Sequence, residues 1–162
     1  MNILECTIKM KQETRAHYER LAEAVTEKEL KNLFSLLASA EDEHIEKVVT
    51  MRDTMNKIGN VDFNPLDASV CVFSPNIDPR HLAETLRNDP DAYRHVVQEE
   101  EETIEFFDNL KKQAENEDMK KVYQELADKE REHLTTLENI YFFVEEPRTY
   151  LEWGEFSNLK TL

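Results

Sequence analysis

Two long stretches of the chain, residues 1–58 and 91–146, contain neither glycine nor proline, and their apolar residues recur at spacings of three and four. This spacing places the apolar side chains on one face of a helix. Each stretch is about twice as long as an ordinary helix, so we expect each to fold into a helical hairpin. The predicted breaks are the capping-box pattern at Thr26 to Glu29 and the polar run 115–118. We therefore expect four helices, at 3–25, 27–58, 90–114 and 117–144.

The segments that join and follow these helices contain the glycines and prolines. Gly59 is placed to end the second helix, and Asp89-Pro90 to cap the third. Between them we expect a long crossover, 60–88, with one short helix over 79–87. The apolar tail 145–162 is expected to pack on the bundle or on a second subunit. Residues 1–144 are thus predicted to form an all-α, antiparallel four-helix bundle made of two hairpins and one crossover.

On each predicted helix, the regularly spaced positions that face the interior form a stripe. The stripes of the second and fourth helices are apolar except at one place, where each contains Glu-x-x-His. These pairs are Glu41 with His44 and Glu130 with His133. A shift of 89 residues superposes one pair on the other without a gap, together with much of both stripes. A repeated hairpin joined by one long crossover is the layout of a ferritin-like bundle.

A carboxylate and an imidazole three residues apart on a helix can hold one metal ion together. An ionised carboxylate in a helix seam is costly to bury without a partner. Four polar groups that hydrogen-bond one another in the core are the alternative, but the repeated pairs favour a metal site. The third helix adds Glu100 to its own stripe, 30 residues before Glu130. The residue 30 before Glu41 is Lys11, which is not a carboxylate.

On these motifs, residues 1–144 resemble the four-helix domain of rubrerythrins, in the ferritin-like di-iron carboxylate superfamily. The resemblance implies two iron ions held by a Glu from each of the first and third helices and a Glu-x-x-His from each of the others. Five positions match that ligand set: Glu41, His44, Glu100, Glu130 and His133. It further implies a homodimer. The resemblance to rubrerythrins would also imply a rubredoxin module, with two Cys-x-x-Cys pairs, fused to the bundle. This sequence contains no Cys-x-x-Cys pair. Electrons would then come from an external donor such as a rubredoxin.

Lys11 departs from the family pattern and changes the charge of the centre. Three glutamates and one ammonium sum to -2, which one divalent ion neutralises. We expect one ion near Glu100, Glu130 and His133, with the Lys11 ammonium at the other position, since a protonated amine cannot ligate a metal. Two alternatives stay open: bound iron lowers the pKa of Lys11 until it ligates, or Lys11 points away and Glu13 replaces it through a helix distortion.

Other polar residues on the stripes are assigned more ordinary roles. Tyr18 lies two turns from Lys11, and the resemblance implies a hydrogen bond to a ligand carboxylate or a part in radical chemistry; a core aromatic is the alternative. Thr14 and Thr103 are expected to bond their own helices. Of the glutamates at 99–102, only Glu100 is expected to point inward.

The amino-acid composition limits the kinds of molecule that the protein is expected to bind. The formal net charge is -15, which disfavours nucleic acid and anionic membranes. The sequence has no apolar run long enough to span a membrane and no secretion signal at its start, so we expect a cytoplasmic protein. Its two cysteines, Cys6 and Cys71, are expected to be reduced thiols of little consequence.

Three functions follow from the sequence. The first is a non-haem iron protein that reacts with peroxide or oxygen, as rubrerythrins do. The second is a metal-binding protein without turnover; iron is implied by the resemblance, and other divalent ions fit the same ligands. The third is a non-catalytic bundle in which Lys11 neutralises a degenerate site.

Overall fold

The computed structural model describes residues 1–59, 66, 68–72 and 92–161, and for 92, 93 and 143–161 it describes the backbone alone. Within these ranges the chain forms four α-helices, one short 3-10 helix and no strand. They are α1 (Ile3–Ala24), α2 (Lys28–Ile58), η1 (Ala68–Val70), α4 (Ala92–Gln113) and α5 (Glu117–Thr161). None of these helices is long and apolar enough to cross a membrane.

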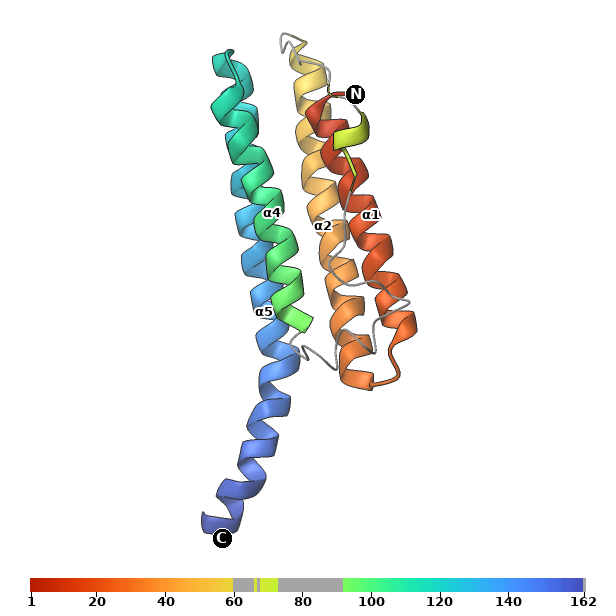
Figure 1. The fold of residues 1–162 in the computed structure, drawn as a ribbon, viewed down its shortest axis with the longest axis vertical. Helices are drawn as coiled ribbons and strands as arrows, with labels where there is room; N and C mark the ends of the chain where they lie inside the picture. The colour runs from red at the N-terminus through yellow and green to blue at the C-terminus, as the bar shows by residue number, and fades with distance from the viewer. Residues whose placement is uncertain (60–65, 67, 73–91, 162) are drawn as a thin grey trace.

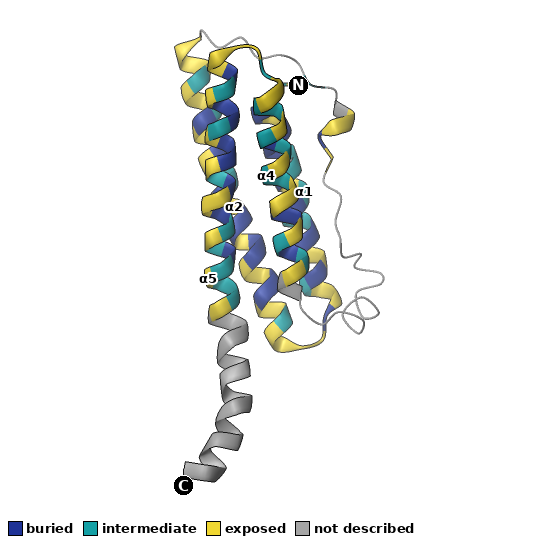
Figure 2. Ribbon diagram, turned by 60° about the vertical axis from the view of Figure 1, so that its left-hand side comes forward, coloured by how far each residue is buried: buried dark blue, intermediate teal, exposed yellow. Residues whose placement is uncertain are grey.

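The helices form a bundle of two antiparallel hairpins, in which α2 and α4 run in the same direction (Figure 1). α1 packs on α2, α4 packs on α5, and α2 and α5 join the two hairpins. The all-α, ferritin-like bundle predicted from the stripes is therefore confirmed. Figure 2 shows the buried residues facing inward along all four helices. Every described residue of the predicted stripes is buried or partly buried.

The start of α1 and the two ends of α2 show which boundary signals in the sequence were interpreted correctly. Gly59 ends α2 in the left-handed region, with φ of 73°, and its N–H donates to the Met55 carbonyl, as predicted. The capping box at Thr26 is absent, because α2 is capped by Glu27 without a side-chain hydrogen bond. The capping box lies instead at the start of α1, where Asn2 and Glu5 bond each other's backbone N–H. Asp89-Pro90 and the segment 79–87 lie outside the described residues.

The fourth helix extends beyond its predicted end. The predicted end was 144, and Pro147, which lacks the N–H that a helix interior uses, lies just beyond it. α5 instead continues to Thr161 and runs past the other helices (Figure 1). The predicted packing of the 145–162 side chains lies outside what the structure describes.

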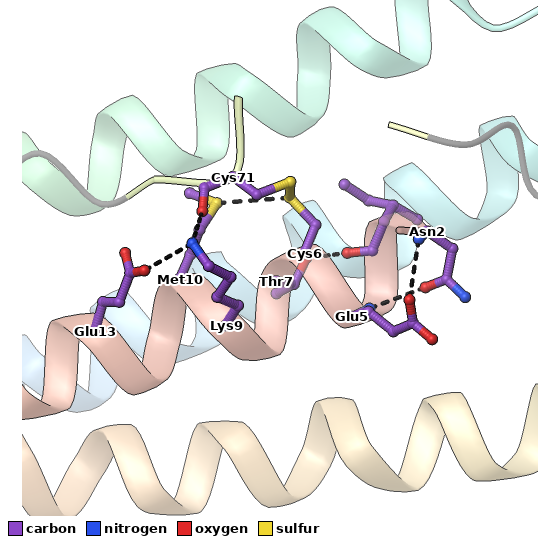
Figure 3. Close-up of a disulfide and its surroundings, with 9 residues drawn as sticks. Asn2, Glu5, Cys6, Thr7, Lys9, Met10, Glu13 and Cys71 are labelled. Carbon is purple, nitrogen blue, oxygen red and sulfur yellow. Dashed lines mark hydrogen bonds and ion pairs between the residues drawn. A yellow bond between two sulfur atoms is a disulfide. The ribbon is translucent and has the colours of Figure 1, made fainter. Parts of the chain in front are cut away.

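The two cysteines form a disulfide, so the prediction of two reduced thiols is wrong. Cys6 on α1 is bonded to Cys71 in the crossover, with a Cα–Cα distance of 5.2 Å and a sequence separation of 65 (Figure 3). Both residues are fully buried. Lys9 Nζ also donates to the Cys71 carbonyl over 2.7 Å, and the Leu66 N–H donates to the Met1 carbonyl. The described part of the crossover is thus fastened along the N-terminal half of α1.

Candidate metal centre

Six charged or polar side chains from all four long helices meet in the middle of the bundle. α1 supplies Lys11, α2 supplies Glu41 and His44, α4 supplies Glu100, and α5 supplies Glu130 and His133. None of the six residues is more than 4% exposed. The stripe pattern explains this burial, because each residue takes a seam position that is otherwise apolar. The sequence therefore identified the members of the cluster.

Lys11 lies among all three glutamates. Its Nζ donates to Glu100 Oε2 over 3.0 Å and pairs with Glu130 Oε2 at 2.9 Å and Glu41 Oε2 at 3.8 Å. The side chain does not point away into solvent, and Glu13 does not replace it. Glu13 is partly exposed and pairs with Lys9 instead.

The two Glu-x-x-His pairs exchange partners across the hairpins. His44 Nε2 donates to Glu130 Oε1 over 2.9 Å, and His133 Nε2 donates to Glu41 Oε1 over 2.8 Å. The two rings stack, with centroids 4.5 Å apart and planes 22° from parallel. Each imidazole thus bonds the glutamate of the other motif, and these bonds hold α2 against α5 at the centre.

Burial and the charges of the cluster raise the pKa values of some of its members and lower that of His44. Burial acts against a charge on Lys11, but Glu100, Glu130 and Glu41 together raise the pKa of Lys11 above its ordinary value. Burial, with the positive charges of Lys11 and His133, lowers the pKa of His44 to about 2. Burial also acts against a charge on His133, yet Glu41 raises its pKa. Burial raises the pKa of the Glu100 carboxyl. In the metal-free protein Lys11 is therefore the fixed cation of the site and His44 is neutral.

Three of these groups are arranged as a possible metal site. Ligand atoms of Glu41, Glu100 and His133 all lie within 4.8 Å of one another. Oε2 of Glu41 is buried and accepts no hydrogen bond within the described residues. Carboxylate and imidazole donors suit iron and other divalent ions. The residues therefore fit a metal ion, which would satisfy that oxygen as well.

This triad differs from the expected one in one member. From the sequence we expected Glu130 with Glu100 and His133, and Lys11 beside Glu41 and His44. In the structure Glu41 takes the place of Glu130, which is held by His44 and Lys11. The exchange follows from the crossed pairing, because each histidine approaches the glutamate of the other hairpin.

The environment of the cluster confirms some ordinary roles and changes others. Thr14 and Thr103 donate to carbonyls of their own helices, as expected. The Tyr18 hydroxyl is fully buried but has no hydrogen-bond partner among the described residues, so the hydrogen bond implied for it is not made. Burial and the nearby carboxylates raise the pKa of Tyr18.

One acidic residue was misplaced. Glu99 was expected on a solvated face, but it is buried beside Glu100. Its position three residues after Val96 belongs to a wider apolar stripe, and that spacing could have indicated burial.

Comparison with known proteins agrees with this arrangement. A family model described as Rubrerythrin matches residues 2–141, a range that contains all six residues of the cluster. No curated protein and no solved structure matches the chain. Because the match covers most of the chain, the protein belongs to the rubrerythrin family.

Proposed function

We propose that this is a non-haem iron protein whose centre binds one iron ion beside Lys11 and reacts with peroxide or oxygen. The observation that carries the proposal is the buried triad of Glu41, Glu100 and His133, with ligand atoms within 4.8 Å of one another. Membership of the rubrerythrin family supports iron as the ion. When bound, iron supplies electrons by passing between its ferrous and ferric states.

Charge favours one ion over two. Glu41, Glu100 and Glu130 contribute three negative charges, and Lys11 Nζ, which pairs with all three, contributes one positive charge. The sum of -2 is neutralised by one divalent ion, whereas two divalent ions would leave a net charge of +2 in a buried site. Lys11 cannot ligate while its amine is protonated. Its contribution is to hold Glu100 and Glu130 in place of a second ion.

A second function is favoured by the same lysine. Lys11 already pairs with every glutamate of the cluster, which would let the bundle persist without a redox-active ion. Metal binding without turnover, or a non-catalytic bundle, would then be the role of the protein.

Metal analysis of the purified protein separates these functions. We expect about one iron per chain after anaerobic loading, and loss of the ferrous state on addition of hydrogen peroxide. Binding without oxidation would support the metal-binding role, and no binding of any divalent ion would leave only the non-catalytic bundle.

Lys11→Glu tests the place given to Lys11. This variant should raise bound iron towards two per chain, because it restores a fourth carboxylate. Lys47→Glu is the matched control: it makes the same charge change on the surface of α2, where Lys47 pairs weakly with Glu43. Equal iron content in both variants would overturn the assignment of Lys11.

Turnover also needs partners. Both cysteines of the sequence lie in the disulfide, so we propose an external electron donor such as a rubredoxin. Reduction of the peroxide-oxidised centre by rubredoxin would test it. The homodimer predicted from the resemblance stays a prediction, which light scattering on the purified protein would check.

A further inference from the structure

Val70 and Val72 of the crossover lie against the side of the bundle between α1 and α4. The closely packed helix pairs of the described chain are α1 with α2, α4 with α5 and α2 with α5, so α1 and α4 are not such a pair. A pocket of about 160 Å³ lies there. Its walls come from three segments: Met10 of α1, Val70 and Val72 of the crossover, and Glu99, Glu102, Thr103 and Phe106 of α4. Residues 70–72 therefore form the outer wall of a pocket between α1 and α4.

The disulfide attaches that outer wall covalently to α1. Val70 and Val72 are 49% and 53% exposed, so they bury little apolar area of their own. Cys71 between them is fully buried and covalently bonded to Cys6. Two hydrogen bonds also attach this part of the crossover to α1 and to Met1. Lys9 donates to the Cys71 carbonyl (Figure 3), and the Leu66 N–H donates to the Met1 carbonyl. A hydrogen bond contributes only about 1 kcal/mol net, so the covalent S–S bond is a stronger attachment than either of these hydrogen bonds.

The inner wall of the pocket borders the buried cluster. Glu99 lines the pocket, and the next residue, Glu100, carries the carboxylate to which Lys11 donates. The charge of Glu99 also contributes to the raised pKa of Tyr18, which places Glu99 within electrostatic reach of that buried hydroxyl. The cluster residues themselves are at most 4% exposed, so a small molecule reaches them only when the bundle opens locally, and this pocket lies beside them.

We propose that the Cys6–Cys71 disulfide is a redox latch that holds residues 68–72 as the outer wall of this pocket. A dithiol reductant cleaves the S–S bond: two electrons and two protons pass to Cys6 and Cys71, which become thiols, and the reductant becomes a disulfide. Hydrogen peroxide reverses the step by accepting those electrons and protons, which yields two molecules of water. Reduction frees the wall and opens the pocket between α1 and α4; oxidation closes it.

Oxidation of Met10 in the metal-free protein tests the latch. Met10 lines the pocket, is partly buried, and has its sulfur 3.9 Å from Cys6 Sγ. Dilute hydrogen peroxide would be added to the oxidised wild type and to the Cys6→Ser/Cys71→Ser variant, and each methionine sulfoxide followed by mass spectrometry. We expect Met10 to react about tenfold faster in the variant, because local opening sets the rate. Met119, which is buried in α5, reports general destabilisation of the protein, so the latch requires a larger rise in rate at Met10 than at Met119.

Two controls separate a latch from a structural crosslink. Lys9→Gln removes the hydrogen bond to Cys71 but keeps the disulfide, and should leave Met10 protected. In folded wild type, dithiothreitol should make both cysteines reactive towards iodoacetamide while circular dichroism shows the helices intact; this arm also serves if the serine variant does not fold.

Several results would overturn the latch. These are equal Met10 rates with and without the disulfide, a parallel rise at Met119, an open pocket in Lys9→Gln, or a disulfide that dithiothreitol reduces only in unfolded protein. None of these readouts requires a bound metal. Failure of the latch is therefore distinguishable from failure of the proposed iron function.

Discussion

Lys11 shows how one substitution within a ligand set can keep a buried cluster balanced. An isolated ammonium in a protein core loses its proton readily, because burial penalises the charge. Here three carboxylates within 3.8 Å reverse that effect. The same carboxylates would repel one another without the ammonium, so lysine and glutamates stabilise each other's ionised forms.

Replacement of Lys11 by methionine therefore has a predictable cost. Lys11→Met keeps the length of the side chain but leaves three buried carboxylates without their cation. We expect the free energy of unfolding of the metal-free protein to fall by about 3–5 kcal/mol in urea titrations. A divalent ion should restore part of this loss. Lys47→Met, on the surface, should change stability by less than about 0.5 kcal/mol; a similar small effect at Lys11 would contradict the role given to it.

The stability of the metal-free protein should depend on pH through His44. Its pKa is lowered to about 2 in the folded state, from 6.5. Below pH 6.5 the unfolded chain therefore takes up a proton that folded His44 does not, and stability falls with falling pH. His44→Gln can still donate to Glu130 but does not titrate. Between about pH 6.5 and 5, wild type should lose stability relative to this variant in urea titrations.

His133 provides the control of opposite sign. Its pKa is raised above 6.5 in the folded state, so its contribution is complete below pH 6.5 and is lost as the pH rises through the raised value. Wild type should therefore lose stability relative to His133→Gln above pH 6.5. The same sign of change in both variants would show that the two rings do not occupy the different environments described.

The members of the cluster could be predicted from sequence, but their pairing could not. Seam spacing and the 89-residue repeat identify which side chains point inward, because both depend only on position along a helix. Which glutamate each histidine meets depends on how α2 and α5 are placed against each other, and neighbouring seam positions allow either pairing. The exchange of Glu41 for Glu130 in the triad has this origin.

At the scale of the element, glycine was a better boundary signal than proline or the capping pattern. Gly59 takes a conformation that other residues adopt at a cost, so its position determines where α2 ends. Thr26-x-x-Glu29 is a short pattern that charged sequences produce often, and Asn2 with Glu5 formed the box instead. Pro147 did not end α5.

Gly59→Ala tests the end of α2. A Cβ at this position would meet no atom within 4 Å, so the only penalty is that of the left-handed backbone, with φ of +73°. We expect a loss of about 1 kcal/mol in the free energy of unfolding, measured in urea. Gly59→Asn should lose less, because asparagine tolerates this conformation. A larger loss for Asn than for Ala would contradict the backbone explanation.

At the scale of the whole molecule, the disulfide is the feature that the sequence did not predict. Two cysteines 65 residues apart carry no spacing signal. Their meeting depends on the path of the crossover back along α1, which the helix stripes do not specify. Once formed, the bond closes a loop that contains most of α1 and all of α2.

Reduction should therefore lower the stability of the whole protein. Loop-closure entropy for 65 residues corresponds to about 4 kcal/mol. Urea titrations of oxidised and reduced wild type should differ by this amount, and Cys71→Ser should match the reduced protein. A difference below about 1 kcal/mol would mean that the unfolded chain is already restricted without the bond.

Because the chain contains two copies of one hairpin, the replacement of a glutamate by Lys11 in the first copy sets the net charge of the centre. The first hairpin brings Lys11 and Glu41 to the centre, and the second brings Glu100 and Glu130. Two copies of the first hairpin would have a centre without net charge, and two copies of the second would carry four negative charges. The former could exist without metal, and the latter would require two divalent ions. The present chain combines one hairpin of each kind. Exchange of Lys11 for glutamate, or of Glu100 for lysine, would therefore move the charge of the centre towards that of one or the other duplicated hairpin.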